Sequence, residues 1–355
     1  MKPFLFLTAA ALAIAGPCAD LKTNSFGKEV TIESASEIAA SDKLPAHCDV
    51  RGVIWPEAKF VVKLPAAWND RFQMVGNGGT AGTISMSAVD AALRKGFAAS
   101  STDTGHDAAK EPLATFAYVT PTNPNGERKL LDFAYLSVHN TAVLAKEIIK
   151  SHYGRAPKYS YWVGCSTGGR QGMQEAQRYP EDFDGLVIGA PGLNLTGNVM
   201  RRIWVGQAQQ GAAALPVEKL PLLRRLVYER CDRSDGLADG IIDDPRRCLF
   251  QPASDLPKCS GADGADCFTA AQIGGLSKIY GGVFAGNNRQ LFPGEPVGSE
   301  EVWAENLVGP SKLVLPRAES QMKFYALDPP PGPSGATRSS TSIGTPQAWP
   351  RRRRS

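Results

Sequence analysis

A serine framed by glycines is the feature of this sequence best suited to covalent chemistry. Residues 164–168 read Gly-Cys-Ser-Thr-Gly and place Ser166 in the spacing Gly-x-Ser-x-Gly. A nucleophilic serine has to project from a tight turn, where large side chains two positions away would collide with the flanking elements. The backbone N–H of Thr167 would then face the negative charge that develops on an attacked carbonyl oxygen. These residue types and this spacing indicate acyl transfer through Ser166.

The residues on either side of Ser166 predict the elements that position it. Residues 159–163 are aromatic and β-branched, which favours a buried strand. The residues after the serine predict an amphipathic helical run with Met173, Ala176, Tyr179 and Phe183 as its apolar positions. Strand, turn and helix together make the nucleophile elbow of α/β-hydrolases, whereas the motif alone could also be an ordinary loop. The flanking elements favour the elbow.

A glycine cluster at 76–79, Gly-Asn-Gly-Gly, follows a predicted strand at 71–75. Hydrolases with such an elbow build their second oxyanion donor in this position. An ordinary turn would have the same glycine-rich sequence. His106 precedes Ser166, whereas the histidine follows the nucleophile in α/β-hydrolases, so we do not expect it to be the base. His139 is expected to be a packed or rim residue of a helix.

Strands alternate with helices in the first half of the chain. We expect strands at 53–55, 59–64, 71–75, 97–101 and 185–188, helices at 88–95 and 132–152, and a partly irregular lead-in at 20–50. This order predicts the α/β class with a largely parallel sheet covered by helices. From 193 onward, helical runs at 201–210 and 218–230 precede cysteine-bearing loops. This second part is predicted to be an inserted lid over the active site.

Composition restricts the location and the partners of the chain. Its 355 residues are 43% hydrophobic and 21% charged, as in globular proteins, and a net charge of +4 is too small to predict a nucleic-acid partner. Lys2, an apolar run at 4–15 and a small-residue site at Ala15 predict a signal peptide at 1–15. No other apolar stretch is long enough to span a membrane. We therefore expect a secreted or periplasmic protein without a membrane partner; its oligomeric state is open.

Export makes disulfides the expected state of the seven cysteines. Local pairing predicts Cys231–Cys248 and Cys259–Cys267 and leaves Cys18–Cys48 as a third bridge. Cys165, beside the candidate nucleophile, is then the odd thiol. None of the cysteines forms a Cys-x-x-Cys pair, so they do not predict zinc.

An aspartate-rich loop between Cys231 and Cys248 resembles a calcium site. Asp232, Asp235 and Asp239 offer hard oxygen ligands, with backbone carbonyls between them. The loop is not an EF-hand, since positions 3 and 12 counted from Asp235 are leucine and arginine. The alternative is a solvated acidic loop held by the disulfide.

Three motifs together resemble the tannase and feruloyl esterase family, which also contains the hydrolase of mono(hydroxyethyl) terephthalate. They are Gly-Cys-Ser-Thr-Gly-Gly-Arg-Gln-Gly at 164–172, Ser-Thr-Asp-Thr-Gly-His at 101–106 and Asp-Gly-Leu-Ala-Asp-Gly-Ile-Ile-Asp at 235–243. The resemblance runs from about residue 20 to about residue 327. It implies an α/β-hydrolase fold with a large inserted lid, and a serine carboxylic ester hydrolase that acts on small aromatic esters such as those of phenolic acids.

The resemblance also implies roles for particular residues. Ser166 would be the nucleophile, and the backbone N–H groups of Thr167 and Gly79 would hold the oxyanion. A structural calcium ion, Ca²⁺, would fix the lid. Its ligands would be Asp232, Asp235, the Leu237 carbonyl, Asp239 and the Ile241 carbonyl.

The sequence departs from the family at its C-terminal end. The family's acid and its His-Cys pair come from a C-terminal return to the hydrolase domain, but no histidine follows His152 and no cysteine follows Cys267. Residues 329–355 are rich in proline, serine and arginine and predict a disordered or out-of-frame tail. The C-terminal part of the hydrolase domain is then expected to be missing.

The expected domains are a signal peptide at 1–15, the N-terminal part of the hydrolase domain at 16–193, the lid at 194–328 and the tail at 329–355. Two alternatives to a phenolic-ester hydrolase remain. The chain could be a catalytically dead fragment or binding protein without the acid and histidine of a triad. It could also be a general lipase or carboxylesterase.

Overall fold

The computed structural model describes residues 17–308, 314–326 and 332–334. The expected signal peptide at 1–15 and all of the tail except 332–334 lie outside these residues. The chain divides into two compact units, Met1–Leu193 and Asn194–Ser355. Among the helices described, none has the length and apolar character needed to cross a bilayer.

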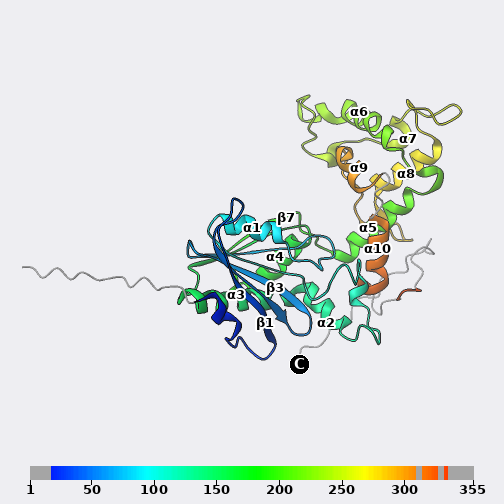
Figure 1. Cartoon of the computed structure of the whole chain (residues 1–355). Helices are drawn as coiled ribbons and strands as arrows, with labels where there is room; N and C mark the ends of the chain where they lie inside the picture. The colour runs from blue at the N-terminus through cyan, green and yellow to red at the C-terminus, as the bar shows by residue number, and fades with distance from the viewer. Residues whose placement is uncertain (1–16, 309–313, 327–331, 335–355) are drawn as a thin grey trace, which may run out of the picture. The chain divides into compact units, whose positions relative to one another are not determined.

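The first unit is built on a seven-stranded mixed sheet in the order β1-β2-β3-β5-β4-β6-β7 (Figure 1). The strands are β1 (Val30–Ile38), β2 (His47–Ile54), β3 (Ala58–Pro65), β4 (Arg71–Val75), β5 (Ala98–Thr102), β6 (Tyr159–Cys165) and β7 (Gly185–Gly189). Neighbouring strands from β1 to β5 run antiparallel, and those from β5 to β7 run parallel. The expected largely parallel sheet is therefore correct only for the half that carries Ser166.

The lead-in at 20–50, expected to be partly irregular, contains the whole of one strand and the start of another. A short 3₁₀ helix η1 (Cys18–Lys22) leads to β1, which pairs with β2 over its whole length. On β1 only Ile32 is buried. The strand therefore lacks the row of buried apolar residues by which a strand is usually predicted. β2 contains a buried carboxylate, Asp49, which Arg51 contacts at 2.8 Å. The polar residues His47 and Asp49, both buried, interrupt the apolar pattern at the start of β2.

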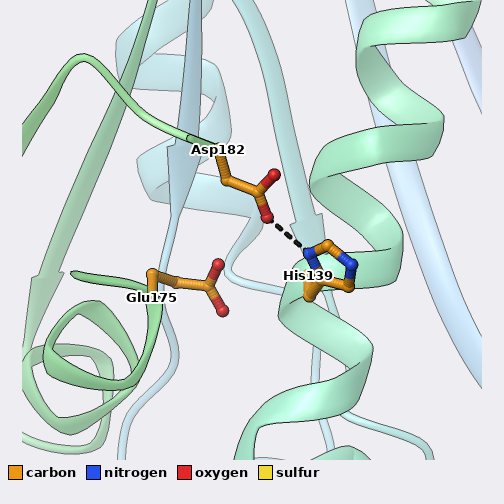
Figure 2. Close-up of side chains that lie close together, drawn as sticks. All are labelled: His139, Glu175 and Asp182. Atoms are coloured by element: carbon orange, nitrogen blue, oxygen red, sulfur yellow. Dashed lines mark hydrogen bonds and ion pairs between the residues drawn. The ribbon is translucent and has the colours of Figure 1, made fainter. Parts of the chain in front are cut away.

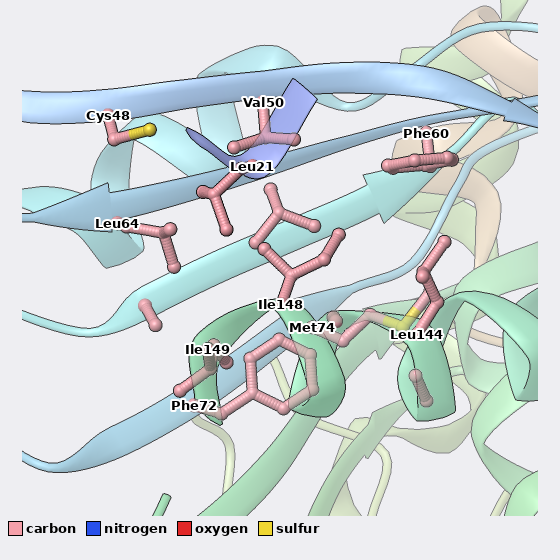
Figure 3. Close-up of a cluster of buried hydrophobic side chains, with 14 of the residues drawn as sticks. Leu21, Cys48, Val50, Phe60, Leu64, Phe72, Met74, Leu144, Ile148 and Ile149 are labelled. Carbon is pink, nitrogen blue, oxygen red and sulfur yellow. The ribbon is translucent and has the colours of Figure 1, made fainter. Parts of the chain in front are cut away.

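Helices cover both faces of the sheet. α3 (Ser137–Tyr153) packs on the face that carries Phe72 and Met74 of β4, and its Leu144, Ile148 and Ile149 complete that core (Figure 3). α1 (Met86–Arg94) covers the opposite face, which carries Val61, Val75 and Ala99. The remaining helical segments are η2 (Thr115–Ala117), α2 (Gly126–Leu131), a π-helical turn η3 (Asp132–Leu136) and α4 (Thr167–Arg178). With both faces covered, β3 has few exposed positions.

The second unit is largely helical. Its helices are α5 (Leu195–Ala208), η4 (Gly211–Ala213), η5 (Val217–Lys219), α6 (Leu220–Cys231), η6 (Asp232–Asp235), η7 (Pro245–Arg247), α7 (Pro252–Asp255), α8 (Ala270–Gly281), η8 (Glu300–Val302), α9 (Trp303–Asn306), α10 (Val314–Gln321) and η9 (Met322–Ala326). A two-stranded sheet joins β8 (Val283–Phe284) to β9 (Gln290–Phe292). Phe268 and Trp303 are fully buried in its core. The helices expected at 201–210 and 218–230 correspond to α5 and α6.

The predicted cysteine pairing is confirmed. Cys18 bonds to Cys48, Cys231 to Cys248 and Cys259 to Cys267, which ties η1 to β2 and closes two loops of the second unit. Cys165 is a free, exposed thiol, as the odd count predicts.

Candidate active site

Ser166 lies on the sharp turn that its motif predicts. β6 ends at Cys165 and α4 begins at Thr167, so Ser166 alone forms the junction. Its backbone has φ 59° and ψ −114°, a region that non-glycine residues seldom occupy. A strained backbone of this kind costs free energy and persists only where the surrounding structure holds it in place. Such residues are frequent at functional sites. The side chain of Ser166 is exposed, as a nucleophile requires.

Two glycines are required where the elbow packs against its surroundings. A Cβ on Gly164 would lie 2.5 Å from the carbonyl oxygen of Gly168, and a Cβ on Gly76 would lie 2.6 Å from the Cα of Gly168. Neither contact is possible for a real side chain. The first turn of α4 therefore packs backbone to backbone against the ends of β6 and β4.

The buried face of α4 differs from the expected one. Met173 and Ala176 are exposed, whereas Gln171, Gly172 and Glu175 are buried together with Gly168 and Gly169. The reason is the fully buried ring of Trp162 on β6, which needs a flat surface: a Cβ on Gly172 would lie 2.6 Å from its Nε1. Periodicity of apolar residues could not find a buried face made of glycine, glutamine and glutamate.

The loop after β4 is bonded directly to the start of α4. The hydroxyl of Thr167 donates a hydrogen bond to the carbonyl oxygen of Gly79 at 2.5 Å. The amide of Gly168 donates to the carbonyl oxygen of Asn77 at 2.7 Å. Thr167 is the first residue of α4, and the first amides of a helix have no acceptor within the helix. The predicted glycine cluster and the predicted elbow are thus adjacent.

A buried amide pair fixes this loop, and sequence reasoning gave it no role. The backbone N–H of Asn77 donates to Oε1 of Gln171 at 3.1 Å, and Nε2 of Gln171 donates to Oδ1 of Asn77 at 3.0 Å. The Nδ2 group of Asn77 donates to the carbonyl oxygens of Thr83 and Thr102 at 2.8 Å each. The only sequence signals for this pair were Asn77, inside the glycine cluster, and Gln171, five residues after Ser166.

His106 lies in an aromatic cluster. Its ring is 2% exposed and stacks on Phe116 with centroids 3.8 Å apart, and Phe133 contacts it edge-on. Burial lowers the pKa of His106 to about 4, so the imidazole is neutral at pH 7. These contacts pack the His106 ring among aromatic side chains.

The aspartates of the candidate calcium loop are held by amides of the same loop. Asp232 accepts from Gly240 N at 3.0 Å, Asp235 from Leu237 N at 2.9 Å and Asp239 from Ile241 N at 3.1 Å. Each bond uses one carboxylate oxygen. Carboxylate oxygens are the hard donors that Ca²⁺ prefers, so the second oxygens of these aspartates make the loop a candidate for the ion.

A statistical description of the family named "Tannase and feruloyl esterase" matches residues 43–313. The chain belongs to this family. Within it, an uncharacterized esterase of Xanthomonas campestris is 38% identical over 295 residues, which cover 78% of this chain and 49% of the esterase. The mono(2-hydroxyethyl) terephthalate hydrolase of Piscinibacter sakaiensis is 34% identical over 292 residues, covering 70% of this chain and 48% of that enzyme. The chain thus spans about half the length of these tannase-family relatives.

Solved structures of the tannase and feruloyl esterase family share the fold. Feruloyl esterase B of Aspergillus oryzae superimposes with a TM-score of 0.74 at 24% identity, covering 87% of this chain and 64% of that one. The expectation of an α/β-hydrolase-like fold is confirmed by this likeness and by the mixed, helix-covered sheet.

Proposed function

We propose that the chain carries the nucleophile and the oxyanion donors of a serine carboxylic ester hydrolase. The observation that supports this most directly is the contact between the Thr167 hydroxyl and the Gly79 carbonyl. It brings the loop of Gly78 and Gly79 beside the turn of Ser166. Backbone N–H groups of Thr167 and Gly79 are the proposed oxyanion donors, because such fixed dipoles stabilise charge without reorganising.

The reaction would proceed through an acyl-enzyme on Ser166. The Oγ atom attacks the ester carbonyl carbon while its proton passes to a base, and the resulting oxyanion collapses with loss of the alcohol. Water then attacks the acyl-enzyme, releases the carboxylic acid and returns the proton to Ser166. In serine hydrolases a histidine oriented by an acid carries these protons.

The proposed substrates are small esters of aromatic acids. Relatives of the chain are named as hydrolases of mono(2-hydroxyethyl) terephthalate and as feruloyl esterases, and both names describe aromatic acyl groups. Within the same family, aromatic acyl groups are therefore the first class to test. A general lipase would instead prefer long aliphatic esters.

Two further proposals concern the second unit and the location. The loop of Asp232, Asp235, Leu237, Asp239 and Ile241 would bind a structural Ca²⁺ ion that fixes the loop without taking part in the chemistry. Three disulfides fit an oxidising compartment, so we propose a secreted or periplasmic protein.

Active-site labelling tests the role of Ser166 separately from turnover. The chain would be treated with a fluorophosphonate, which forms a stable bond only with an activated serine, and digested for mass spectrometry. We expect the label on Ser166, and we expect Ser166→Ala to lose both the label and hydrolysis of methyl ferulate and p-nitrophenyl acetate. Ser34→Ala, on β1, is the matched control and should keep both.

The results separate the alternatives. Labelling of Ser166 with faster turnover of methyl ferulate than of a long-chain p-nitrophenyl ester supports the proposal. Absence of label on a folded chain, as shown by circular dichroism, would favour a protein without catalysis.

A further inference from the structure

Three ionisable side chains meet beside α4, nine residues beyond Ser166 in sequence. His139 comes from α3, Glu175 from α4, and Asp182 from the segment between α4 and β7 (Figure 2). Nδ1 of His139 lies 2.6 Å from Oδ2 of Asp182. One ligand atom from each of the three lies within 4.8 Å of the other two, and no other such group occurs among the residues described. His139 is thus a rim residue, as expected, but it has a specific partner.

Glu175 is the member of this cluster that the surrounding protein does not explain. It is 1% exposed, and neither of its carboxylate oxygens accepts a hydrogen bond from a described residue. A buried carboxylate without a partner costs several kcal/mol, so such groups normally pair or coordinate a metal ion. Figure 2 shows its carboxylate directed into the space between His139 and Asp182.

The charges around Glu175 favour a cation in that space. Asp182 brings a second carboxylate beside Glu175, because one ligand atom of each lies within 4.8 Å of the other. The ammonium of Lys146 lies 3.9 Å from Oδ1 of Asp182. That ammonium pairs with Asp182, and neither oxygen of Glu175 accepts a hydrogen bond from it.

We propose that His139, Glu175 and Asp182 bind a divalent transition-metal ion, with Zn²⁺ as the first candidate. One imidazole nitrogen and two carboxylate oxygens are ligands that Zn²⁺ accepts, at about 2.0–2.2 Å, with water in a fourth position. Ca²⁺ prefers six to eight oxygen ligands and fits this set poorly. Nδ1 would be the ligand of His139, which moves the ring proton to Nε2.

The ion would be structural. Glu175 lies nine residues beyond Ser166 in sequence, which corresponds to roughly 13 Å along a helix. Coordination would instead join α3, α4 and the segment leading to β7 at one point. The helix that begins at the elbow would thereby be fixed at its far end. The site is open to solvent through His139, whose side chain is 27% exposed.

Binding to the whole chain tests this proposal. Chain treated with a chelator and then dialysed would be titrated with Zn²⁺ by calorimetry and assayed for bound metal. We expect one Zn²⁺ bound per chain at this site. Its affinity should fall by more than about tenfold in Glu175→Gln, Asp182→Asn and His139→Gln. Glu181→Gln changes an exposed neighbour of Asp182 in the same chemical way and should bind like the parent.

Two further arms separate this site from other possible zinc ligands. Asp235→Asn, in the aspartate-rich loop, should leave the binding unchanged. X-ray absorption at the zinc edge should show nitrogen and oxygen ligands only, whereas a sulfur ligand at about 2.3 Å would indicate Cys165 and overturn the proposal. Unchanged affinity in a folded Glu175→Gln variant, or no binding at millimolar Zn²⁺, would also overturn it. The absorption measurement on the parent chain decides the question even where a variant does not fold.

Discussion

The hydroxyl of Thr167 donates a 2.5 Å hydrogen bond to the carbonyl oxygen of Gly79, a residue 88 positions earlier in the sequence. This bond joins the first turn of α4 to the loop after β4. The two proposed oxyanion donors belong to these same two residues. Their relative position therefore depends on a side chain that takes no part in the proposed chemistry.

Removal of that hydroxyl should loosen the loop while leaving both backbone N–H groups present. Thr167→Val keeps the shape of the side chain and deletes one hydrogen bond, which is worth about 1 kcal/mol of stability. We expect kcat/KM for methyl ferulate to fall by about tenfold, mostly in kcat, because the donors act in the transition state. Thr23→Val removes an exposed hydroxyl contact far from the loop and should change neither quantity. Equal rates for the two variants would show that the loop holds its position without Thr167.

Substitution of Gly172 tests the packing of α4 on the sheet. In Gly172→Ala the new Cβ would lie 2.6 Å from Nε1 and 2.7 Å from Cδ1 of Trp162. Alanine favours a helix over glycine by about 1 kcal/mol, but overpacking a dense core costs about 1–3 kcal/mol. A net loss of stability is therefore expected in urea unfolding. Gly274→Ala on α8, where no atom lies within 4 Å, should gain stability instead. A more stable Gly172→Ala variant would contradict the packing described.

These same residues show what could be predicted from the sequence. Ser166 and its turn were predictable because the requirement for glycine at 164 and 168 is local. The contact between Thr167 and Gly79 depends on the pairing of β4 with β6, which are far apart in the sequence. The sequence therefore indicated only that the loop of Gly79 could supply an oxyanion donor. The buried face of α4 was misassigned, because Gly172 and Glu175 carry no apolar signal. β1 was missed because only its Ile32 is buried, and the start of β2 was missed because buried Asp49 and His47 interrupt the apolar pattern.

Asp103 gives the stability of the fold a specific dependence on pH. Burial raises its pKa to about 7, although its Oδ1 accepts hydrogen bonds from Lys59 N and Gly105 N at 2.9 Å each. Between about pH 4 and pH 7 the folded chain therefore holds a proton that the unfolded chain lacks. The contribution of Asp103 to stability is full below that window and is lost as pH rises through it.

Asp103→Asn keeps the acceptor oxygen and removes the titration. The fall in unfolding free energy between pH 5 and pH 8 should shrink by on the order of 2 kcal/mol in this variant. His106, whose pKa burial lowers to about 4, gives the opposite trend below about pH 6.5, so the comparison must be with the parent chain. Asp42→Asn, which changes an exposed aspartate in the same chemical way, is the control. Identical pH profiles for parent and Asp103→Asn would refute the assignment.

Removal of calcium should destabilise the second unit if its aspartate-rich loop binds the ion. After chelation, Ca²⁺ at about one hundred times its Kd should restore about 2.7 kcal/mol of stability, seen as a higher Tm. Asp235→Asn removes a proposed ligand and should abolish most of the increase. Asp243→Asn lies in the same loop outside the proposed ligand set and should respond as the parent does. A Tm that does not respond to Ca²⁺ would leave the loop as a solvated acidic turn.

The strand order has a consequence for the behaviour of the chain in solution. Within the part of the chain described, β7 ends the sheet and pairs with β6 alone, and its Val187 is 66% exposed. An unpaired strand edge offers a row of backbone donors and acceptors to any other extended segment, and edge strands without charged residues invite aggregation. The residues of β7 are Gly-Leu-Val-Ile-Gly, without a charge or a proline. Association of chains through the edge of β7, more than unfolding, would then limit the concentration at which the chain stays in solution.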